Sequence, residues 1–192
     1  MNDDAVVTVS LKNLAHQKTQ LWGAVLGKAH YADLVAELER SAFPSVHRTF
    51  VMDFSDIVTT SPSYLKQLLS PLFNSDSQRP QIPLVANLSS DVREDLEVFL
   101  NQRGWVLREV EVVGDQARHL SLVGEIEQTA LDTLRALEQA NEATAADLHQ
   151  MHKDLRIAQT AWSNRLATLN QLLLAVRDKV GREWIYKPTV ET

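Results

Sequence analysis

A cluster of side chains that can hydrogen-bond to nucleic-acid bases lies in the last quarter of the 192-residue sequence. The cluster comprises Gln159, Thr160, Ser163, Asn164 and Arg165. Arginine forms paired hydrogen bonds with guanine, and glutamine or asparagine forms them with adenine. A helix that presented these side chains on its surface could therefore read base edges in a major groove.

Positive charge accumulates in the same region. Residues 151 to 187 include seven lysines and arginines and three acidic residues, a net charge of +4. The whole chain has 19 basic and 25 acidic residues and a net charge of −6, so the remainder carries −10. Positive potential is thus concentrated where phosphate contacts would be needed, and we expect Arg177, Lys179 and Arg182 to meet phosphates or a minor groove.

Other pairs of residues could carry catalysis or bind a metal ion, but the sequence supplies no complete site. His149 and His152 are spaced so that both imidazoles could reach one metal ion, yet no third ligand is fixed. Asp53 and Asp56 follow a predicted strand and could form an acid–base pair, although such residues more often cap turns. Glycine-rich phosphate loops, Gly-x-Ser-x-Gly motifs and zinc-protease motifs are absent from the sequence. We therefore expect no enzymatic activity, no cofactor and no metal site.

The composition is typical of a soluble globular protein, with 44% hydrophobic and 23% charged residues. The chain contains no cysteine, which excludes disulfides and thiolate metal sites and fits a reducing cytoplasm. No signal peptide is recognisable, and no run approaches the roughly 20 apolar residues that span a bilayer. The length fits one ordinary domain or two small ones.

Over the first 120 residues, short apolar runs rich in β-branched and aromatic residues alternate with segments of helical period. The predicted strands are residues 6–9, 22–26, 49–54, 83–88 and 106–113. One helix is predicted around residues 31–38, a second where Ser61 is the cap and Pro62 the first residue, and a third at 90–103, ended by Gly104. This alternation predicts an α/β fold, a mixed sheet with helices packed on it.

After Gly124 the sequence becomes mainly helical. The predicted elements are helices at 126–138, 145–155 and 159–172, followed by strands at 176–180 and 183–186 that form a hairpin. Thr144 and Asp147 have the spacing of a capping box at the start of the second helix. Trp162 is expected to lie in the core of the three helices. Trp184 and Tyr186 are expected to cover that core, and an interface with a second subunit is the alternative.

This second part resembles a winged helix-turn-helix domain. The resemblance is carried by Ala143-Thr144-Ala145-Ala146-Asp147-Leu148, Ile157-Ala158-Gln159-Thr160-Ala161-Trp162-Ser163-Asn164-Arg165-Leu166, Leu169-Asn170-Gln171-Leu172 and the hairpin at 176–186. Arg156 and Leu173 stand where this family commonly has glycine. The resemblance implies that helix 159–172 enters the major groove and that the hairpin is the wing.

The first part resembles the STAS fold, found in anti-sigma-factor antagonists. The resemblance is carried by Phe50-Val51-Met52-Asp53-Phe54-Ser55-Asp56-Ile57, Ser61-Pro62-Ser63-Tyr64-Leu65 and Leu84-Val85-Ala86-Asn87-Leu88. In those antagonists a serine at the start of the helix accepts a phosphate, but Pro62 occupies that position here. Ser61 and Ser63 remain as neighbouring candidates, and the resemblance implies a partner-binding or regulatory surface around Ser61, Ser63 and Tyr64.

These features favour a bacterial, cytoplasmic DNA-binding transcriptional regulator. Residues 1–118 would form a STAS-like domain that senses a signal or binds a partner protein, and residues 119–192 a winged helix that binds double-stranded DNA. A homodimer is expected, because one helix-turn-helix reads only a few base pairs. The alternative is an adaptor in a partner-switching or kinase-linked system, whose winged helix contacts proteins instead.

Overall fold

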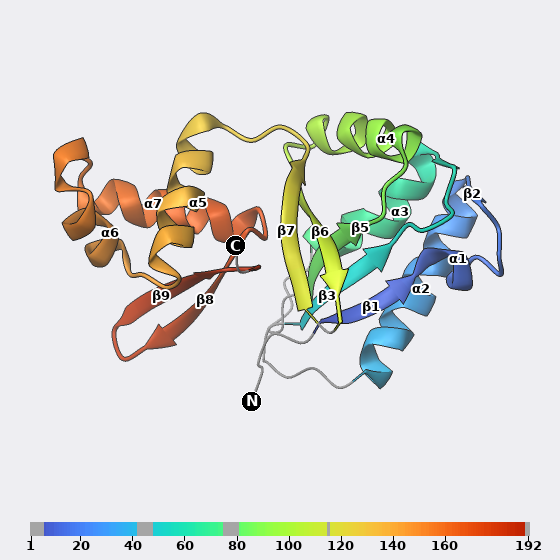
Figure 1. The fold of residues 1–192 in the computed structure, drawn as a ribbon, viewed down its shortest axis with the longest axis horizontal. Coiled ribbons are helices and arrows are strands. Elements are labelled where there is room, and N and C mark those ends of the chain that lie inside the picture. The colour runs from blue at the N-terminus through green and yellow to red at the C-terminus, as the bar shows by residue number, and fades with distance from the viewer. Residues whose placement is uncertain (1–5, 42–47, 75–80, 115, 191–192) are drawn as a thin grey trace. The chain divides into compact units, whose positions relative to one another are not determined.

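The computed structural model describes residues 6–41, 48–74, 81–114 and 116–190. The chain divides into two units, Met1–Glu125 and Ile126–Thr192 (Figure 1). The expected boundary at 118/119 falls within strand β7 (Gln116–Val123), which belongs to the sheet of the first unit. The chain has the α/β content that its sequence predicts. No helix of the described part is long and apolar enough to cross a membrane.

A five-stranded sheet organises the first unit. Its order is β1 (Val7–Ser10), β3 (Arg48–Asp53), β5 (Gln81–Ala86), β6 (Leu107–Val113) and β7. The first four strands run parallel, and β7 pairs antiparallel with β6. Two short strands, β2 (Gln20–Leu21) and β4 (Thr59–Thr60), pair in parallel and form a separate small sheet. The predicted mixed sheet is therefore confirmed.

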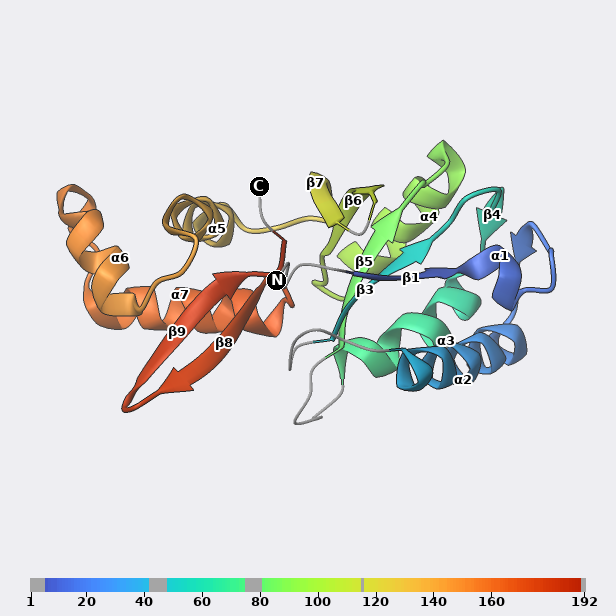
Figure 2. The same cartoon turned by 60° about the horizontal axis from the view of Figure 1, so that its bottom comes forward.

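The described part of this unit contains four helices: α1 (Leu11–Leu14), α2 (Ala24–Arg40), α3 (Pro62–Phe73) and α4 (Ser90–Asn101). Helices α2 and α3 lie side by side in both views (Figures 1 and 2). The three longer helices and the strands share one hydrophobic core, which includes Phe50, Met52, Leu65 and Leu96. Parallel strands joined in sequence order by right-handed crossovers carry their helices on one face, which explains this single core.

The caps predicted for two of these helices are present. Ser61 Oγ accepts a hydrogen bond from Tyr64 N at 3.3 Å, and Pro62 is the first residue of α3. Gly104 follows α4 with a φ of +64°, a left-handed conformation that glycine adopts without strain. The local signals that the sequence offered therefore set the start of α3 and the exit from α4.

The strand predicted at 22–26 is wrong. Gly23 has a φ of +91° and α2 begins at Ala24. The apolar and β-branched residues that favoured a strand point to solvent, with Trp22 60% and Val25 87% exposed. The buried side of α2 is instead Gly27, His30, Leu34 and Leu38, which recur at helical spacing.

In its described residues, the second unit contains three α-helices, a short 3₁₀ helix and a hairpin. The elements are α5 (Gln128–Ala140), α6 (Ala145–Met151), the short 3₁₀ helix η1 (Lys153–Leu155), α7 (Gln159–Gln171), β8 (Ala175–Val180) and β9 (Glu183–Pro188). Trp162 and Tyr186 are buried, as expected, together with Leu134, Leu137 and Leu166. Ala143 and Tyr186 exchange two backbone hydrogen bonds, at 3.0 and 2.9 Å, which tie the α5–α6 connection to β9.

Candidate nucleic-acid interface

A tight turn sets the direction of α7. The capping box at the start of α6 is complete, since Thr144 Oγ1 accepts from Asp147 N at 3.1 Å and Asp147 Oδ2 accepts from Thr144 N at 2.8 Å. Beyond α6, Arg156 has a φ of +53° and reverses the chain. His149 Nδ1 lies 2.9 Å from the carbonyl oxygen of Ile157 and joins α6 to the residues that precede α7.

Helix α7 is held by one face and exposes the opposite one. Trp162, Leu166 and Leu169 are buried. With about 100° of rotation per residue, the opposite side of the helix is centred on Thr160, Asn164 and Gln171. The exposed side chains predicted to hydrogen-bond to bases are Gln159, Thr160, Ser163 and Asn164. The structure therefore brings four of the five predicted residues onto the surface of α7.

Arg165 lies apart from these four residues. It is half-buried, and its guanidinium carbon lies 5.7 Å from the centroid of the Trp162 ring. Helical rotation places Arg165 about 60° from Trp162 and about 100° from Asn164. Arg165 therefore flanks the buried face of the helix and is less exposed than the other four residues.

The hairpin gathers its cations around a tryptophan. Lys179 pairs with Trp184 and Arg177 with Tyr186, so these four side chains share one face. The Arg177 guanidinium carbon lies 4.5 Å from the Trp184 ring centroid, and Lys179 Nζ lies 5.8 Å from it. Trp184 is 42% exposed, so the expectation that it covers the core is wrong. It lies two residues before Tyr186 in β9, nearer the turn at Gly181.

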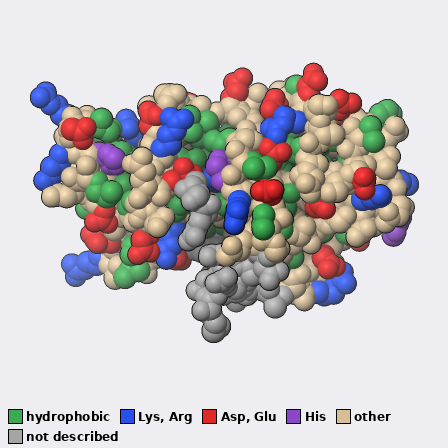
Figure 3. Space-filling view, in the orientation of Figure 1, with side chains coloured by type: hydrophobic (Ala, Val, Ile, Leu, Met, Phe, Trp, Pro, Cys, Tyr) green, Lys and Arg blue, Asp and Glu red, His purple; other side chains and the backbone are tan. Residues whose placement is uncertain are grey.

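Arg182 completes the cations predicted for the hairpin. It follows Gly181, whose φ of +62° forms the turn between the two strands, and its side chain is exposed. Figure 3 shows Lys and Arg side chains projecting from the rim of the second unit, with acidic side chains between them. The three predicted wing cations thus lie on one hairpin, two along one face and one at its tip.

The three residues predicted as a partner or regulatory surface lie at the start of α3. Ser63 is exposed, and Ser61 is half-buried. The Ser61 hydroxyl accepts a hydrogen bond from Gly23 N at 3.1 Å in addition to that from Tyr64 N. Tyr64 is fully buried, and its hydroxyl lies 3.0 Å from His30 Nδ1. The expectation that Tyr64 contributes to an exposed surface is wrong.

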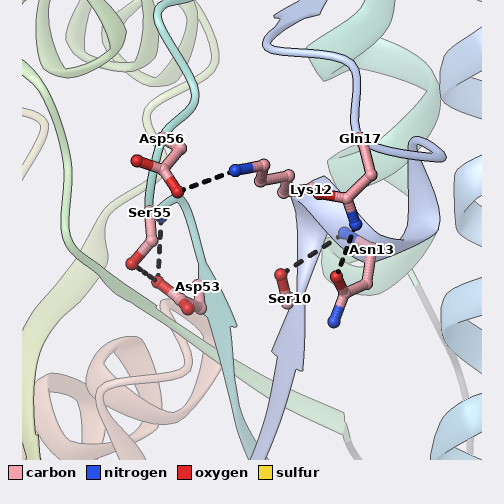
Figure 4. Close-up of polar contacts among 7 residues, drawn as sticks. All are labelled: Ser10, Lys12, Asn13, Gln17, Asp53, Ser55 and Asp56. Carbon is pink, nitrogen blue, oxygen red and sulfur yellow. Dashed lines mark hydrogen bonds and ion pairs between the residues drawn. The ribbon is translucent and has the colours of Figure 1, made fainter.

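Polar side chains also gather where β1 and β3 end (Figure 4). Asp53 Oδ1 accepts hydrogen bonds from Ser55 N at 2.9 Å and Ser55 Oγ at 2.7 Å, as a turn cap does, and from Asn87 Nδ2 at 2.8 Å. Lys12 Nζ lies 2.9 Å from Asp56 Oδ2. Each carboxylate is thus held by a neighbouring side chain.

His149 and His152 gain no further ligand in space. Across the described residues, no three His, Cys, Asp or Glu side chains are grouped to hold a metal ion. His149 is engaged with the Ile157 carbonyl, and the His152 ring lies 5.6 Å from that of Trp162, centroid to centroid. Both histidines therefore take part in the packing of the second unit.

Comparison with known proteins adds no relative. No family model, no curated protein and no solved structure matches the chain. The function of the chain is therefore inferred from its own residues.

Proposed function

We propose that the chain is a DNA-binding transcriptional regulator whose second unit is a winged helix. The single observation that carries the proposal is the pairing, in one small unit, of an exposed polar face on α7 with a hairpin that bears three exposed or partly exposed cations. In this proposal the first unit is a STAS-like domain that senses a signal or binds a partner protein.

Helix α7 would contact the bases. Thr160, Ser163 and Asn164 present hydroxyl and amide groups on its exposed face, and Gln159 stands at its first turn. Amide side chains suit adenine, and hydroxyls bond to more than one base. Because Arg165 flanks the buried face, it is not included among the base contacts.

The hairpin would contact the backbone or a minor groove. Arg177 and Lys179 lie over Trp184, and Arg182 extends from the turn. Cations that neutralise phosphates release counterions, so affinity falls steeply as salt rises. A homodimer would place two copies of α7 about one helical turn of DNA apart, on two half-sites.

The test is fluorescence anisotropy of the purified chain with DNA from upstream of its own gene and with a scrambled duplex, across a series of salt concentrations. We expect tighter binding to the native duplex and a linear fall of log affinity with log salt. Equal affinity for both duplexes would remove the regulator proposal, as would no binding to either one at low salt.

Two substitutions separate the roles of helix and hairpin. Asn164→Ala should lower affinity for the native duplex and reduce the preference over the scrambled one, because a base contact is lost. Arg177→Gln should weaken binding to both duplexes and reduce the salt slope by about 0.9, the value for one phosphate contact. The control is Lys66→Gln, an exposed position on α3 of the first unit.

An adaptor in a partner-switching or kinase-linked system is the second candidate, and one surface of the first unit favours it. Trp22, Val25 and Val58 are 60%, 87% and 52% exposed. They lie near Ser61, since Gly23 N donates to Ser61 Oγ and β2 pairs with β4, which follows Val58. Exposed apolar side chains grouped in this way are typical of protein-binding surfaces.

The two candidates predict opposite effects of substitution. If the chain is an adaptor, Trp22→Ser and Ser63→Glu should abolish its cellular activity, whereas Arg182→Ala and Arg165→Ala should leave that activity intact. If it is a regulator, Arg182→Ala should weaken DNA binding, and the substitutions at Trp22 and Ser63 should leave DNA affinity unchanged. DNA affinity and reporter expression, measured on the same variants, distinguish these patterns.

A further inference from the structure

A cleft lies within the second unit between α5 and the residues that lead into α7. Its volume is about 430 Å³, inside the range of roughly 300 to 1,000 Å³ that is usual for small-molecule sites. Its apolar wall includes Ala136, Leu155 and Ile157. None of the residues predicted to contact DNA lines it except Arg165, which the structure places away from the exposed face of α7.

The cleft is lined by more basic than acidic residues. Arg135 and Arg165 line it from α5 and α7, and Asp132 is the acidic residue in its wall. Asp132 accepts a hydrogen bond from Gln128 Nε2 at 2.7 Å and lies 3.8 Å from an Arg135 nitrogen, with both side chains more than half exposed. Within the described chain Arg165 forms no ion pair, and its contact is the face of Trp162. Its charge is therefore available to an anion.

Two aromatic rings in the same wall carry nitrogens without hydrogen-bond partners. Trp162 is 2% exposed, and its Nε1 has no acceptor among the described residues. His152 Nε2 is likewise buried without a partner. A buried polar group left unpaired costs free energy, so a small side-chain movement that let a ligand's acceptor reach either nitrogen would be favourable.

We propose that this cleft binds a small organic anion, a carboxylate carried on a flat apolar body. The carboxylate would be placed by Arg165 and Arg135, since guanidinium groups bind carboxylates with paired hydrogen bonds. The flat body would pack on Leu155 and Ile157, next to the Arg165 side chain that covers the Trp162 ring. This site is separate from the proposed DNA contacts, so it can be tested without DNA.

The test is a two-dimensional ¹⁵N–¹H spectrum of the full-length chain, observed at the tryptophan indole groups. The chain has four tryptophans, and Trp162→Phe identifies the Trp162 signal by its loss. Benzoate and indole-3-acetate are titrated, and benzamide and inorganic phosphate serve as the matched neutral and inorganic probes. The Trp184 signal, from the hairpin of the same unit, is the internal reference.

We expect the Trp162 signal to shift saturably with at least one of the two carboxylates while the Trp184 signal stays in place. Arg165→Gln should raise the dissociation constant roughly ten- to a hundredfold, the effect of losing one charged hydrogen bond. Arg103→Gln is the matched control, because the Arg103 guanidinium lies 5.1 Å from the Trp105 ring in the first unit. It should leave the dissociation constant unchanged.

Three results would overturn the proposal. The first is no saturable shift of the Trp162 signal with either carboxylate. The second is equal binding of benzamide, which would show that the negative charge is not recognised. The third is equal binding of inorganic phosphate, which would show that the apolar wall contributes nothing. DNA binding does not enter any of these readouts, so failure here and failure of the regulator proposal are distinguishable.

Discussion

The carbonyl oxygen of Tyr64 in α3 occupies the space that a side chain at Gly27 in α2 would need. A Cβ atom at position 27 would lie 2.5 Å from this oxygen and 3.0 Å from Gln67 Cβ. Backbone atoms cannot move aside as the end of a long side chain can. The close approach of α2 and α3 therefore depends on glycine at this position.

Gly27→Ala should destabilise the first unit by about 1 to 3 kcal/mol, the usual cost of overpacking. Alanine favours a helix by about 1 kcal/mol over glycine, so a purely local effect would have the opposite sign. Urea unfolding of the full-length chain measures the difference. Ala29→Ser, at an exposed position of the same helix, is the control and should change stability by less than about 0.5 kcal/mol. A stabilised Gly27→Ala variant would contradict the packing argument.

The buried pair of His30 and Tyr64 should make the first unit sensitive to acid. Burial, the largest cause, lowers the pKa of His30, and burial raises the pKa of the Tyr64 hydroxyl, which stays protonated beside His30 Nδ1. The unfolded chain therefore takes up a proton at the usual histidine pKa of 6.5 before the folded chain does. The free energy of unfolding should fall as pH decreases below about 7.

His30→Gln should flatten this pH dependence, whatever its effect on stability at pH 7. Lys66→Gln, at an exposed position on α3 of the same unit, should leave the dependence in place. Urea unfolding at a series of pH values between 7 and 5 provides the comparison. If the slopes of the wild type and His30→Gln agree, His30 is not the titrating group.

The capping box of α6 should stabilise the second unit above acidic pH. Hydrogen bonds from the backbone and the hydroxyl of Thr144 lower the pKa of the Asp147 carboxyl. Because the folded value is below the unfolded one, the contribution is complete above the usual pKa of 3.8 and is lost as pH falls through the lowered value. Asp147→Ala should cost about 0.5 to 1 kcal/mol at pH 7.

Thermal unfolding at pH 7 and pH 3 measures this contribution. Asp154→Ala, at an exposed acidic position in η1, is the control and should have little effect at either pH. The deficit of Asp147→Ala should shrink at pH 3, since the wild-type carboxyl is then increasingly protonated. A deficit that is the same at both pH values would mean that the charge of Asp147 does not matter.

Substitution by glycine should stabilise the second unit at Arg156 and destabilise it at Lys153. Arg156 is exposed and has a φ of +53°, a conformation that costs a side-chain-bearing residue roughly 1 to 2 kcal/mol. Arg156→Gly should therefore stabilise the second unit by about 0.5 to 1 kcal/mol after the entropy of glycine is subtracted. Lys153→Gly, in helical backbone three residues earlier, should destabilise it by a similar amount. Thermal unfolding of both variants tests the sign, and a loss of stability in Arg156→Gly would contradict the prediction.

Much of the fold could be predicted from the sequence because local signals and burial agree there. Ser61 with Pro62, and Thr144 with Asp147, mark helix starts that the structure contains. Strand β7 has no counterpart among the predicted strands, because it is an edge strand without a continuous apolar run. The sequence indicated β7 only by an alternation of exposed and partly buried residues along 116–123, a weaker indication than an apolar run.

The residue types of the candidate interface could be predicted from the sequence, but the positions of their side chains in space could be predicted less well. Residue types identified α7 as a polar helix, yet they could not show that Arg165 turns toward Trp162 and α5. The flank of a helix faces whichever neighbour the tertiary fold supplies. For the same reason Arg135, which lies on α5 far from the predicted site in sequence, could not be linked to Arg165 before the structure placed both at one cleft.

The strand order of the first unit also bears on how the protein is made. The five strands of its main sheet lie in the same order as in the chain, β1, β3, β5, β6 and β7. Each strand that leaves the ribosome can therefore join the free edge formed by the strand before it, and none has to insert between strands already paired. Since domains fold from the N-terminus during synthesis, this sheet can grow one strand at a time and be completed by β7 before the second unit has emerged.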